Sequence, residues 1–375
     1  MLQDIHLTLM IGPGVPGPAP KAVVDAVRTV QVTSGTNQTG FQITFAVGKS
    51  SMLQTTLLPS GYFDPMTTRV IIVVTVNGLP NVLMDGVVTR QETTPSNDPG
   101  QSTLTITGED LSVLMGVAEI VRPFPALDMA LTVLEILAPY AAFGVVPNVL
   151  PCFFPDTPNP AKEWKTQTRT DLDHIRKLAQ LCGYVFYIEP GPLPGRSIAY
   201  FGPDIRIPVP QPALSINMDA QTNVESLSFS LNGLAKEMTI VTVMDPVTHK
   251  IPIPIPIPDI GIFQPPLGAR PLPPAKIKFA KDADGKQATE VLNQIVGKML
   301  RNASNAITAN GSLDVLRYGR VLRSRSMVGV RGAGLAYDGM YYVDSVTHNI
   351  QRGQYKQSFQ LSRDGLNSNT PVVPV

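Results

Sequence analysis

Apolar residues alternate with small polar residues in several short segments of this chain, and this period-2 pattern predicts β-strands. In the first part of the chain these segments are residues 27–32, 41–47, 68–76, 82–90 and 102–107. Asn77 and Gly78 separate two of them, and both residue types favour the positive φ of a two-residue hairpin turn. Five or six short antiparallel strands of this kind predict a small barrel or sandwich.

The strand pattern of the N-terminal region returns near the C-terminus. The aligned segments are 36–45 with 222–231, 85–88 with 344–347, and 104–111 with 359–366. The offset between the copies is larger in the later segments, so the second copy carries an insertion of about 73 residues. Unrelated strands can also be aligned, because period-2 patterning is common in β proteins. The shared order, polarity and turn position nevertheless favour duplication of one β-domain.

The apolar positions of these strands are the expected core. They alternate with polar residues, so they lie on one face of each strand. The residues are Phe41, Ile43, Phe45, Leu227, Phe229, Leu231, Tyr342, Val346, Phe359 and Leu361. Three copies of a chain with two similar β-domains would present six similar surfaces, which is one way to meet a six-fold partner.

A helical region separates the two β copies. One helix is expected to start at Asp128 as its N-cap, and a clearer one runs from Thr170, with an acid at the capping-box position, to Gly183. Residues 184–188 and 197–201 then predict a hairpin. A small mixed α/β domain is therefore expected between the two copies.

Within the second copy, isoleucine and proline alternate. The repeat comprises Ile251, Pro252, Ile253, Pro254, Ile255, Pro256, Ile257 and Pro258. Half of its backbone donors are missing, so an extended polyproline-II arm is predicted in place of a helix or central strand. Two interpretations stay open: a surface loop that lies on its own domain, and an arm that docks on a neighbouring subunit. Residues 288–300 carry the apolar spacing of an amphipathic helix.

Composition and charge narrow the class of partner. The net charge is +1 and 16% of residues are charged, so no basic excess argues for nucleic-acid recognition. An apolar content of 43% beside this low charge suits a protein that buries much of its surface in an assembly. The most apolar stretch, residues 126–146, is interrupted by Asp128, Glu135 and Pro139, so no membrane span is expected. The N-terminus lacks the features of a secretory signal.

The sequence shows no pattern of catalytic or metal-binding residues. Cys152 and Cys182 form no Cys-x-x-Cys motif and no disulfide framework, and are predicted to be buried free thiols. The four histidines lack metal-ligand spacing, and there is no nucleophile elbow, P-loop or His-Glu-x-x-His motif. Neighbouring acids lie in the first turns of helices, where they stabilise the dipole. We therefore expect no catalytic, cofactor-binding or metal site, and no enzyme.

The C-terminal region resembles a known family. Residues 316–321, 337–348 and 353–363 contain a turn, a Gly-x-Tyr-Tyr-Val strand, a Val-Thr-His strand and a return strand, and residues 171–187 add a helix followed by a Gly-Tyr strand. This pattern resembles the baseplate hub proteins of contractile phage tails, the late-control protein D family. It is also similar to the hub half of the VgrG spikes of type VI secretion and to the hubs of extracellular contractile injection systems.

The resemblance implies a mainly β (α+β) fold. Two similar tube-type antiparallel β-barrels are expected in one chain, with a smaller mixed α/β domain inserted between them. The expected division is a flexible N-terminal segment (1–20), a first barrel (21–112), a connecting domain (113–212), a second barrel (213–245 and 304–366), an inserted proline-rich arm with a helix (246–303) and a C-terminal tail (367–375).

The same resemblance implies a homotrimer with pseudo-six-fold symmetry that joins a hexameric tail tube protein to a trimeric spike, among other baseplate proteins. Its place is an assembled particle, a phage tail or a bacterial injection system, built in the bacterial cytoplasm. The chain ends soon after the second barrel, so the spike is expected to be a separate protein. Two other classes stay open: a β-rich adhesin or receptor-binding tail module, and a peptidoglycan-degrading tail enzyme.

Overall fold

The computed structural model describes residues 5–36, 39–98, 100–153, 165–206, 210–244, 252–257, 263–280, 297 and 304–369. In the N-terminal half the strands are β1 (Ile5–Pro13), β2 (Gly17–Pro18), β3 (Val27–Gly35), β4 (Gly40–Ala46), β5 (Thr68–Val76), β6 (Leu79–Thr94) and β7 (Thr103–Asp110). In the C-terminal half they are β13 (Gln211–Ser215), β14 (Val224–Leu231), β19 (Ile307–Asp314), β20 (Met327–Arg331), β21 (Gly339–Gln351) and β22 (Gln354–Arg363).

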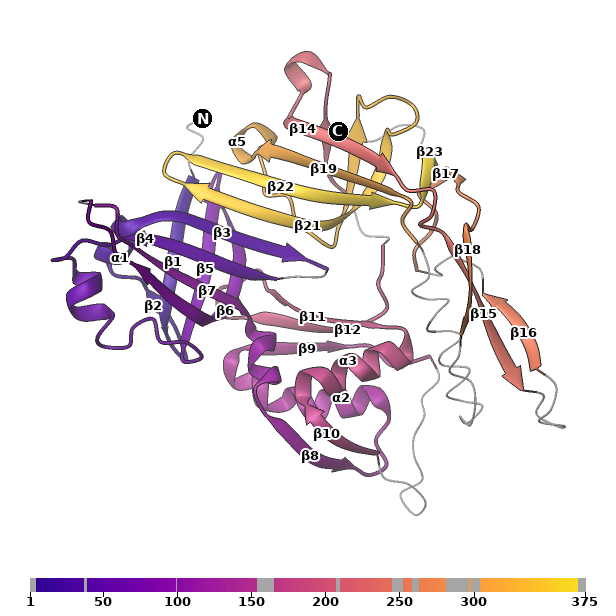
Figure 1. Cartoon of the computed structure of the whole chain (residues 1–375), viewed down its shortest axis with the longest axis horizontal. Helices are drawn as coiled ribbons and strands as arrows, with labels where there is room; N and C mark the ends of the chain where they lie inside the picture. Colours follow the sequence, from indigo (N-terminus) through magenta and orange to yellow (C-terminus); the bar gives the residue numbers. More distant parts are fainter. Residues whose placement is uncertain are drawn as a thin grey trace.

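All these strands belong to one 13-stranded sheet (Figure 1). Its order is β14-β19-β22-β21-β3-β4-β7-β6-β5-β1-β2, with β20 joined to β21 and β13 joined to β20. The mainly β fold is as predicted. The Asn77-Gly78 turn is also confirmed, because the two residues join β5 to β6 with φ of 51° and 81°.

The two halves of the sheet repeat one strand order. The first half runs β3-β4-β7-β6-β5-β1 and the second runs β14-β19-β22-β21-β20-β13, and each series has the same order along the chain. A short helical turn follows the strand in the same place of each series: η1 (Leu53–Leu57) after β4 and α5 (Val315–Tyr318) after β19. The halves differ at their ends, where β1 is antiparallel to β5 but β13 is parallel to β20.

The repeated order corrects one of the three sequence alignments. Residues 85–88 and 344–347 lie on the equivalent strands β6 and β21, and the third pair of segments likewise begins on β7 and β22. Residues 36–45 contribute to β4, however, whereas 222–231 form β14, the counterpart of β3. That alignment is wrong by one strand, because neighbouring strands share the same period-2 pattern.

The described part of the N-terminal segment contains two strands, β1 and β2, where a flexible opening was expected. β1 pairs antiparallel with β5 over its whole length, from Ile5 opposite Val76 to Pro13 opposite Thr68. Leu9 and Ile11 are buried in the core of the sheet. The predicted flexibility is wrong for β1, because apolar residues alternate before the Gly/Pro run and form a buried strand face. Only after β2 does the chain form its first helix, α1 (Lys21–Ala26).

A mixed α/β unit lies between the halves in sequence and packs below the sheet in Figure 1. Its elements are η2 (Leu111–Gly116), β8 (Glu119–Phe124), α2 (Met129–Leu137), η3 (Ala138–Phe143), β9 (Val145–Val149), β10 (Lys165–Thr170), α3 (Asp171–Cys182), β11 (Val185–Pro190) and β12 (Ser197–Gly202). The predicted caps are present: Asp128 Oδ1 accepts from Leu131 N at 2.8 Å, and Thr170 Oγ1 accepts from Asp173 N at 3.2 Å. Gly183 ends α3 with φ 71°.

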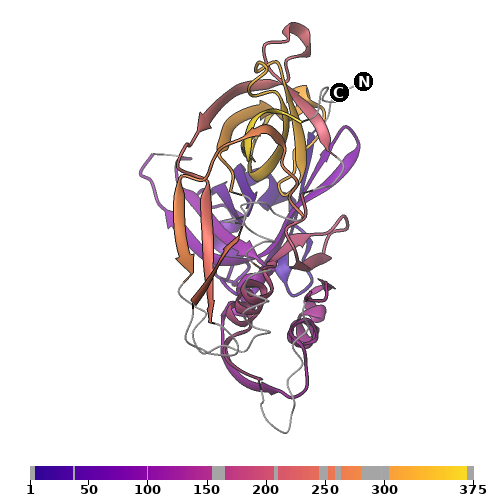
Figure 2. The same ribbon diagram turned by 90° about the vertical axis from the view of Figure 1, so that its right-hand side faces the viewer.

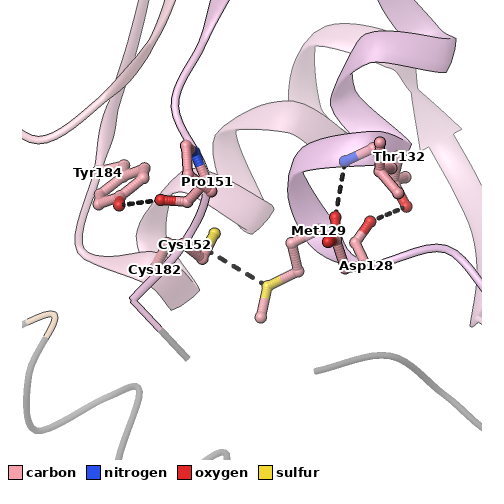
Figure 3. The surroundings of a disulfide bond; sticks show 8 residues. Asp128, Met129, Thr132, Pro151, Cys152, Cys182 and Tyr184 are labelled. Carbon is pink, nitrogen blue, oxygen red and sulfur yellow. Dashed lines mark hydrogen bonds between the residues drawn. A yellow bond between two sulfur atoms is a disulfide. The ribbon is translucent and has the colours of Figure 1, made fainter. Parts of the chain in front are cut away.

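Cys152 and Cys182 form a disulfide (Figure 3). The prediction of two free thiols is therefore wrong. The chain after β9 returns across the end of α3, where Tyr184 Oη donates to Pro151 O at 2.6 Å, and this brings the two Cα atoms to 5.9 Å. That distance lies within the ordinary range for a disulfide. Both cysteines are buried, and Cys182 Sγ lies 3.5 Å from Met129 Sδ.

Residues 237–280 contain a separate three-stranded sheet, the arm sheet, beside the main sheet (Figure 2). It begins before the predicted insertion of 246–303, because residues 237–244, which were expected in the second barrel, belong to it. Its strands are β16 (Pro252–Ile257), β15 (Glu237–Met244) and β18 (Lys276–Ala280), with β15 in the middle. Short β17 (Gly268–Pro271) pairs with β23 (Gly365–Ser368), and η4 (Asp219–Gln221) precedes β14. The polyproline-II expectation is wrong for residues 252–257, which pair antiparallel with β15. Ile251, Pro258 and the predicted 288–300 helix, except Gly297, lie outside the described residues.

Candidate functional site

The two halves of the sheet meet at a strand junction between β3 and β21. The strands pair antiparallel, from Ser345 opposite Gly35 to Gln351 opposite Thr29. Side chains cross the junction, since the Oγ1 atoms of Thr33 and Thr347 lie 3.2 Å apart. β21 pairs with two strands on one side: residues 339–342 pair with β20, and residues 345–351 pair with β3.

The counterparts of the junction strands are open in the single chain. β14, the counterpart of β3, pairs with β19 alone among the described strands. β6, the counterpart of β21, pairs with β5 from Leu79 to Val87. On that same side residues 89–94 have no strand partner within the described part of the chain. The chain therefore holds one completed junction and the two separate components of a second one.

Burial differs between the paired and the open strand. Val30 and Val32 of β3 are 1% and 0% exposed. In β14, Phe229 is only partly buried and Leu231 is 40% exposed. An open strand of this length presents a row of unpaired backbone N–H and C=O groups, which readily pair with a strand of another chain. Together, the exposed apolar side chains and the open edge make β14 the strongest candidate interaction surface.

The predicted core residues differ in how far the structure buries them. Seven of them are at most 4% exposed: Phe41, Ile43, Phe45, Tyr342, Val346, Phe359 and Leu361. Leu227 and Phe229 are partly buried against the core, and the Phe229 ring stacks on Tyr337 with centroids 4.7 Å apart. Leu231 does not lie in the core, because it occupies the end of the open strand.

His348 lies at the junction, in a role that the sequence did not reveal. It sits opposite Val32 and is 4% exposed, with Nδ1 2.7 Å from Tyr355 Oη. Gln357 Nε2 lies 3.2 Å from the same nitrogen and donates to Leu322 O at 2.8 Å. Burial lowers the pKa of His348 to about 3, and Arg323 adds to this effect, so the ring is neutral. When the aligned segments 85–88 and 344–347 are extended by one residue, Thr89 stands opposite His348 in the sequence, so the alignment gives no sign of this buried network.

Tyr342 joins the junction strand to the end of the connecting unit. Its hydroxyl donates to Asp204 Oδ1 at 3.3 Å, and the Arg206 guanidinium lies 4.3 Å from the centre of its ring. Arg206 also pairs with Asp204 at 3.1 Å. Burial raises the pKa of Tyr342, so the hydroxyl keeps its proton. These contacts hold the end of the connecting unit against β21.

The acidic residues near helix starts have structural partners. Asp110 Oδ1 caps η2 by accepting from Ser112 N at 2.8 Å, and burial raises the pKa of this carboxyl. Asp171 is buried and accepts from Tyr140 Oη at 2.9 Å and from Gln167 Nε2 at 2.6 Å. Among the described residues no group of three or more His, Cys, Asp and Glu side chains is placed to hold a metal ion. Within the same residues no helix is long and apolar enough to cross a membrane.

Several solved structures share this fold, and two of them are tail proteins. The chain matches the tail protein from Neisseria meningitidis MC58 with a TM-score of 0.62 and 13% identity, over 96% of this chain and 97% of that one. It matches the 43 kDa tail protein of prophage MuSo2 from Shewanella oneidensis with a TM-score of 0.60 and 13% identity, over 97% and 100%. A chain of the Francisella PdpA–VgrG complex matches with a TM-score of 0.60 and 8% identity, over 100% and 55%.

The resemblance to tail hubs that the sequence indicates is confirmed at the level of the fold. No family model matches the sequence, and no curated protein matches it. The likeness therefore lies in the arrangement of strands and helices.

Proposed function

We propose that this chain is the structural hub of the baseplate of a contractile tail or injection system. Three copies form a ring with pseudo-six-fold symmetry, which joins the hexameric inner tube on one face to the trimeric spike on the other. The fold likeness to tail proteins and to VgrG supports the class of protein. The observation that carries the ring is the match between the completed β3–β21 junction and the open β14 and β6 strands.

In this ring β14 of one copy adds antiparallel to residues 89–94 of β6 in the next copy. Each chain then contributes one internal junction and one junction between copies. Because both junctions use the same strand positions of a repeated sheet, the two halves become nearly equivalent around the ring. Three copies present six similar sheet units, the number needed to match a six-fold tube. Junctions within a copy alternate with junctions between copies, so the ring keeps exact three-fold symmetry and can match a trimeric spike.

The arm belongs to this proposal as a contact with a neighbouring subunit. Removal of residues 251–258 should leave the main sheet folded, because the described part of this segment, Pro252–Ile257, belongs to the separate arm sheet. We expect weaker co-purification with the neighbouring tube and spike proteins. Unchanged co-purification would remove the arm from the assembly interface while leaving the ring untouched.

Cysteine cross-linking tests the junction between copies directly. Ser228→Cys in β14 is combined in turn with Gln91→Cys, Glu92→Cys or Thr93→Cys in β6, and mild oxidation is followed by non-reducing electrophoresis. At least one pair should give covalent dimers and trimers and no larger species, because a closed ring of three leaves no free end. A ladder that continues beyond trimer would indicate an open chain, and absence of any dimer would refute the junction.

The matched control uses the junction that is already present within the chain. Thr33→Cys with Thr347→Cys should form a cross-link within one chain, which does not raise the mass, because these residues lie opposite each other on β3 and β21. Electron microscopy of the uncross-linked protein, with and without its tube and spike partners, provides the second readout. End-on views with three-fold symmetry and six lobes are expected; monomers or elongated particles would instead favour an adhesin.

A further inference from the structure

The Ile-Pro strand β16 is an edge strand of the described arm sheet. The hydrogen-bonding groups on its outer side are unusual. Its register with β15 places Ile253 opposite Val243 and Ile255 opposite Val241, while Pro254 lies opposite Thr242. In an antiparallel strand, successive residues direct their N–H and C=O groups alternately toward the partner and away from it. Proline has no N–H. The isoleucines are therefore the residues that bond β15, and the prolines face away.

The outer edge of β16 consequently offers acceptors without donors. Pro252, Pro254 and Pro256 present three outward carbonyl groups and no outward N–H. A further strand placed there could donate to these carbonyls, but its own carbonyls would find no partner. Half of the ladder would be missing, so strand addition at this edge is disfavoured.

The middle strand explains why such an edge is useful. β15 has the sequence Glu-Met-Thr-Ile-Val-Thr-Val-Met, which is rich in β-branched apolar residues and carries one charge. Segments of this composition associate readily when an edge beside them is open. The opposite edge strand, β18, carries Lys276 and Lys278, and Lys278 Nζ lies 2.6 Å from Glu237 Oε2. Lysines on edge strands also oppose strand addition. Both edges of the arm sheet are thus unfavourable for a new strand.

The main sheet provides the contrast within the same chain. β14 contains no proline and a single charged residue, Glu225, so its outer edge keeps both donors and acceptors. We infer that the Ile-Pro strand closes the arm sheet against strand addition by a second copy of this chain. Self-association by strand pairing is thereby directed to β14. The inference concerns the arm edge and holds whichever closed ring β14 forms.

The test restores the missing donors. Pro252→Val, Pro254→Val and Pro256→Val are combined in one full-length variant, and the control combines Ile253→Val, Ile255→Val and Ile257→Val. Mass is measured by light scattering after gel filtration over a range of protein concentrations. The proline variant should form species at least about two-fold heavier than wild type, increasing with concentration, while the isoleucine control should match wild type. Equal masses for the proline variant and wild type would overturn the inference.

Two further measurements separate the inference from folding effects and from the ring. Hydrogen exchange of the wild-type protein should show protected amides at 253, 255 and 257; exchange at unprotected rates would overturn the strand premise. The single Pro254→Val variant serves if the triple variant fails to fold, with a smaller increase in mass expected and equal mass again refuting the inference. The wild-type protein alone tests the ring. The difference in mass between the proline variant and wild type tests whether the outer edge of β16 resists strand addition.

Discussion

Arg69 and Asp85 form a buried, two-pronged ion pair between β5 and β6. Arg69 Nε donates to Asp85 Oδ1 and Nη2 donates to Oδ2, each at 2.7 Å. Ser197 Oγ donates to the same Oδ2 at 3.1 Å, and Arg69 Nη2 lies 3.4 Å from Gly195 O. One carboxylate and one guanidinium therefore fix the β11–β12 turn of the connecting unit against the main sheet.

Removal of one partner of this pair should destabilise the protein strongly. Asp85→Ala leaves the Arg69 charge buried without a counterion, and such losses cost about 3–5 kcal/mol. The free energy of unfolding measured in urea should fall by this amount. The double variant Arg69→Met with Asp85→Leu should recover much of the loss, because it leaves no unpaired charge.

An exposed ion pair on the same strand provides the control. Arg90 and Glu92 lie 3.2 Å apart, with side chains 72% and 56% exposed. Glu92→Ala should cost less than about 1 kcal/mol, since solvent screens exposed pairs. Equal effects of Asp85→Ala and Glu92→Ala would contradict the role assigned to the buried pair.

His348 should make the protein sensitive to acid. Its folded pKa of about 3 lies below the ordinary value of 6.5, so the unfolded chain binds the proton more tightly. The stabilising contribution of the neutral ring is complete above the unfolded pKa. It is lost progressively as the pH falls from 6.5 toward 3, by about 2–3 kcal/mol at about pH 4.5.

The measurement is the difference in unfolding free energy between wild type and His348→Gln as a function of pH. Glutamine can still accept a hydrogen bond from Tyr355 but does not titrate. Burial raises the pKa of Asp110 and Asp344, which acts in the opposite direction, and both residues are common to the two proteins. The difference should be flat above pH 6.5 and change below it; a flat difference throughout would place His348 in contact with solvent.

The disulfide should stabilise the folded chain under oxidising conditions. Cys152 and Cys182 are separated by 30 positions. Closing a loop of this size lowers the entropy of the unfolded chain, which raises its free energy by about 3–4 kcal/mol at 25 °C. Dithiothreitol should lower the urea midpoint of wild type. The Cys152→Ser, Cys182→Ser double variant should show the lower midpoint with or without reductant. A wild-type midpoint that ignores reductant would show that the bond does not form.

Core and edge substitutions should separate folding from association. Phe359 is 4% exposed, so Phe359→Ala should cost about 3–5 kcal/mol of stability through the cavity that it leaves. Leu231 is 40% exposed on the open strand, and Leu231→Ser should change the stability of the single chain by less than about 0.5 kcal/mol. Sedimentation velocity should nevertheless show weaker self-association for Leu231→Ser. Unchanged association would argue against β14 as the contact between copies.

Local signals in the sequence predicted most individual elements. The alternation around Phe41 and Ile43, the Asn77-Gly78 turn and the Asp128 and Thr170 caps all depend on residues within a few positions of each other. Their physics is short-range: a side chain caps nearby amides, and a strand buries every second residue. The hub-like fold could also be inferred, because the strand and turn pattern near Tyr342 is itself local.

Contacts distant in sequence decided the remainder. β14 occupies the position of β3, Cys152 bonds Cys182, and Pro252–Ile257 lies in a strand because β15 supplies the donors and acceptors that its isoleucines need. His348 is neutral because strands from both halves bury it. The sequence by itself determined most strands and helices outside the N-terminal segment and the arm, and it determined that a β-domain is repeated. Only the tertiary structure decided which strands pair and which edges stay open, since an extended strand is completed by whichever distant partner reaches it.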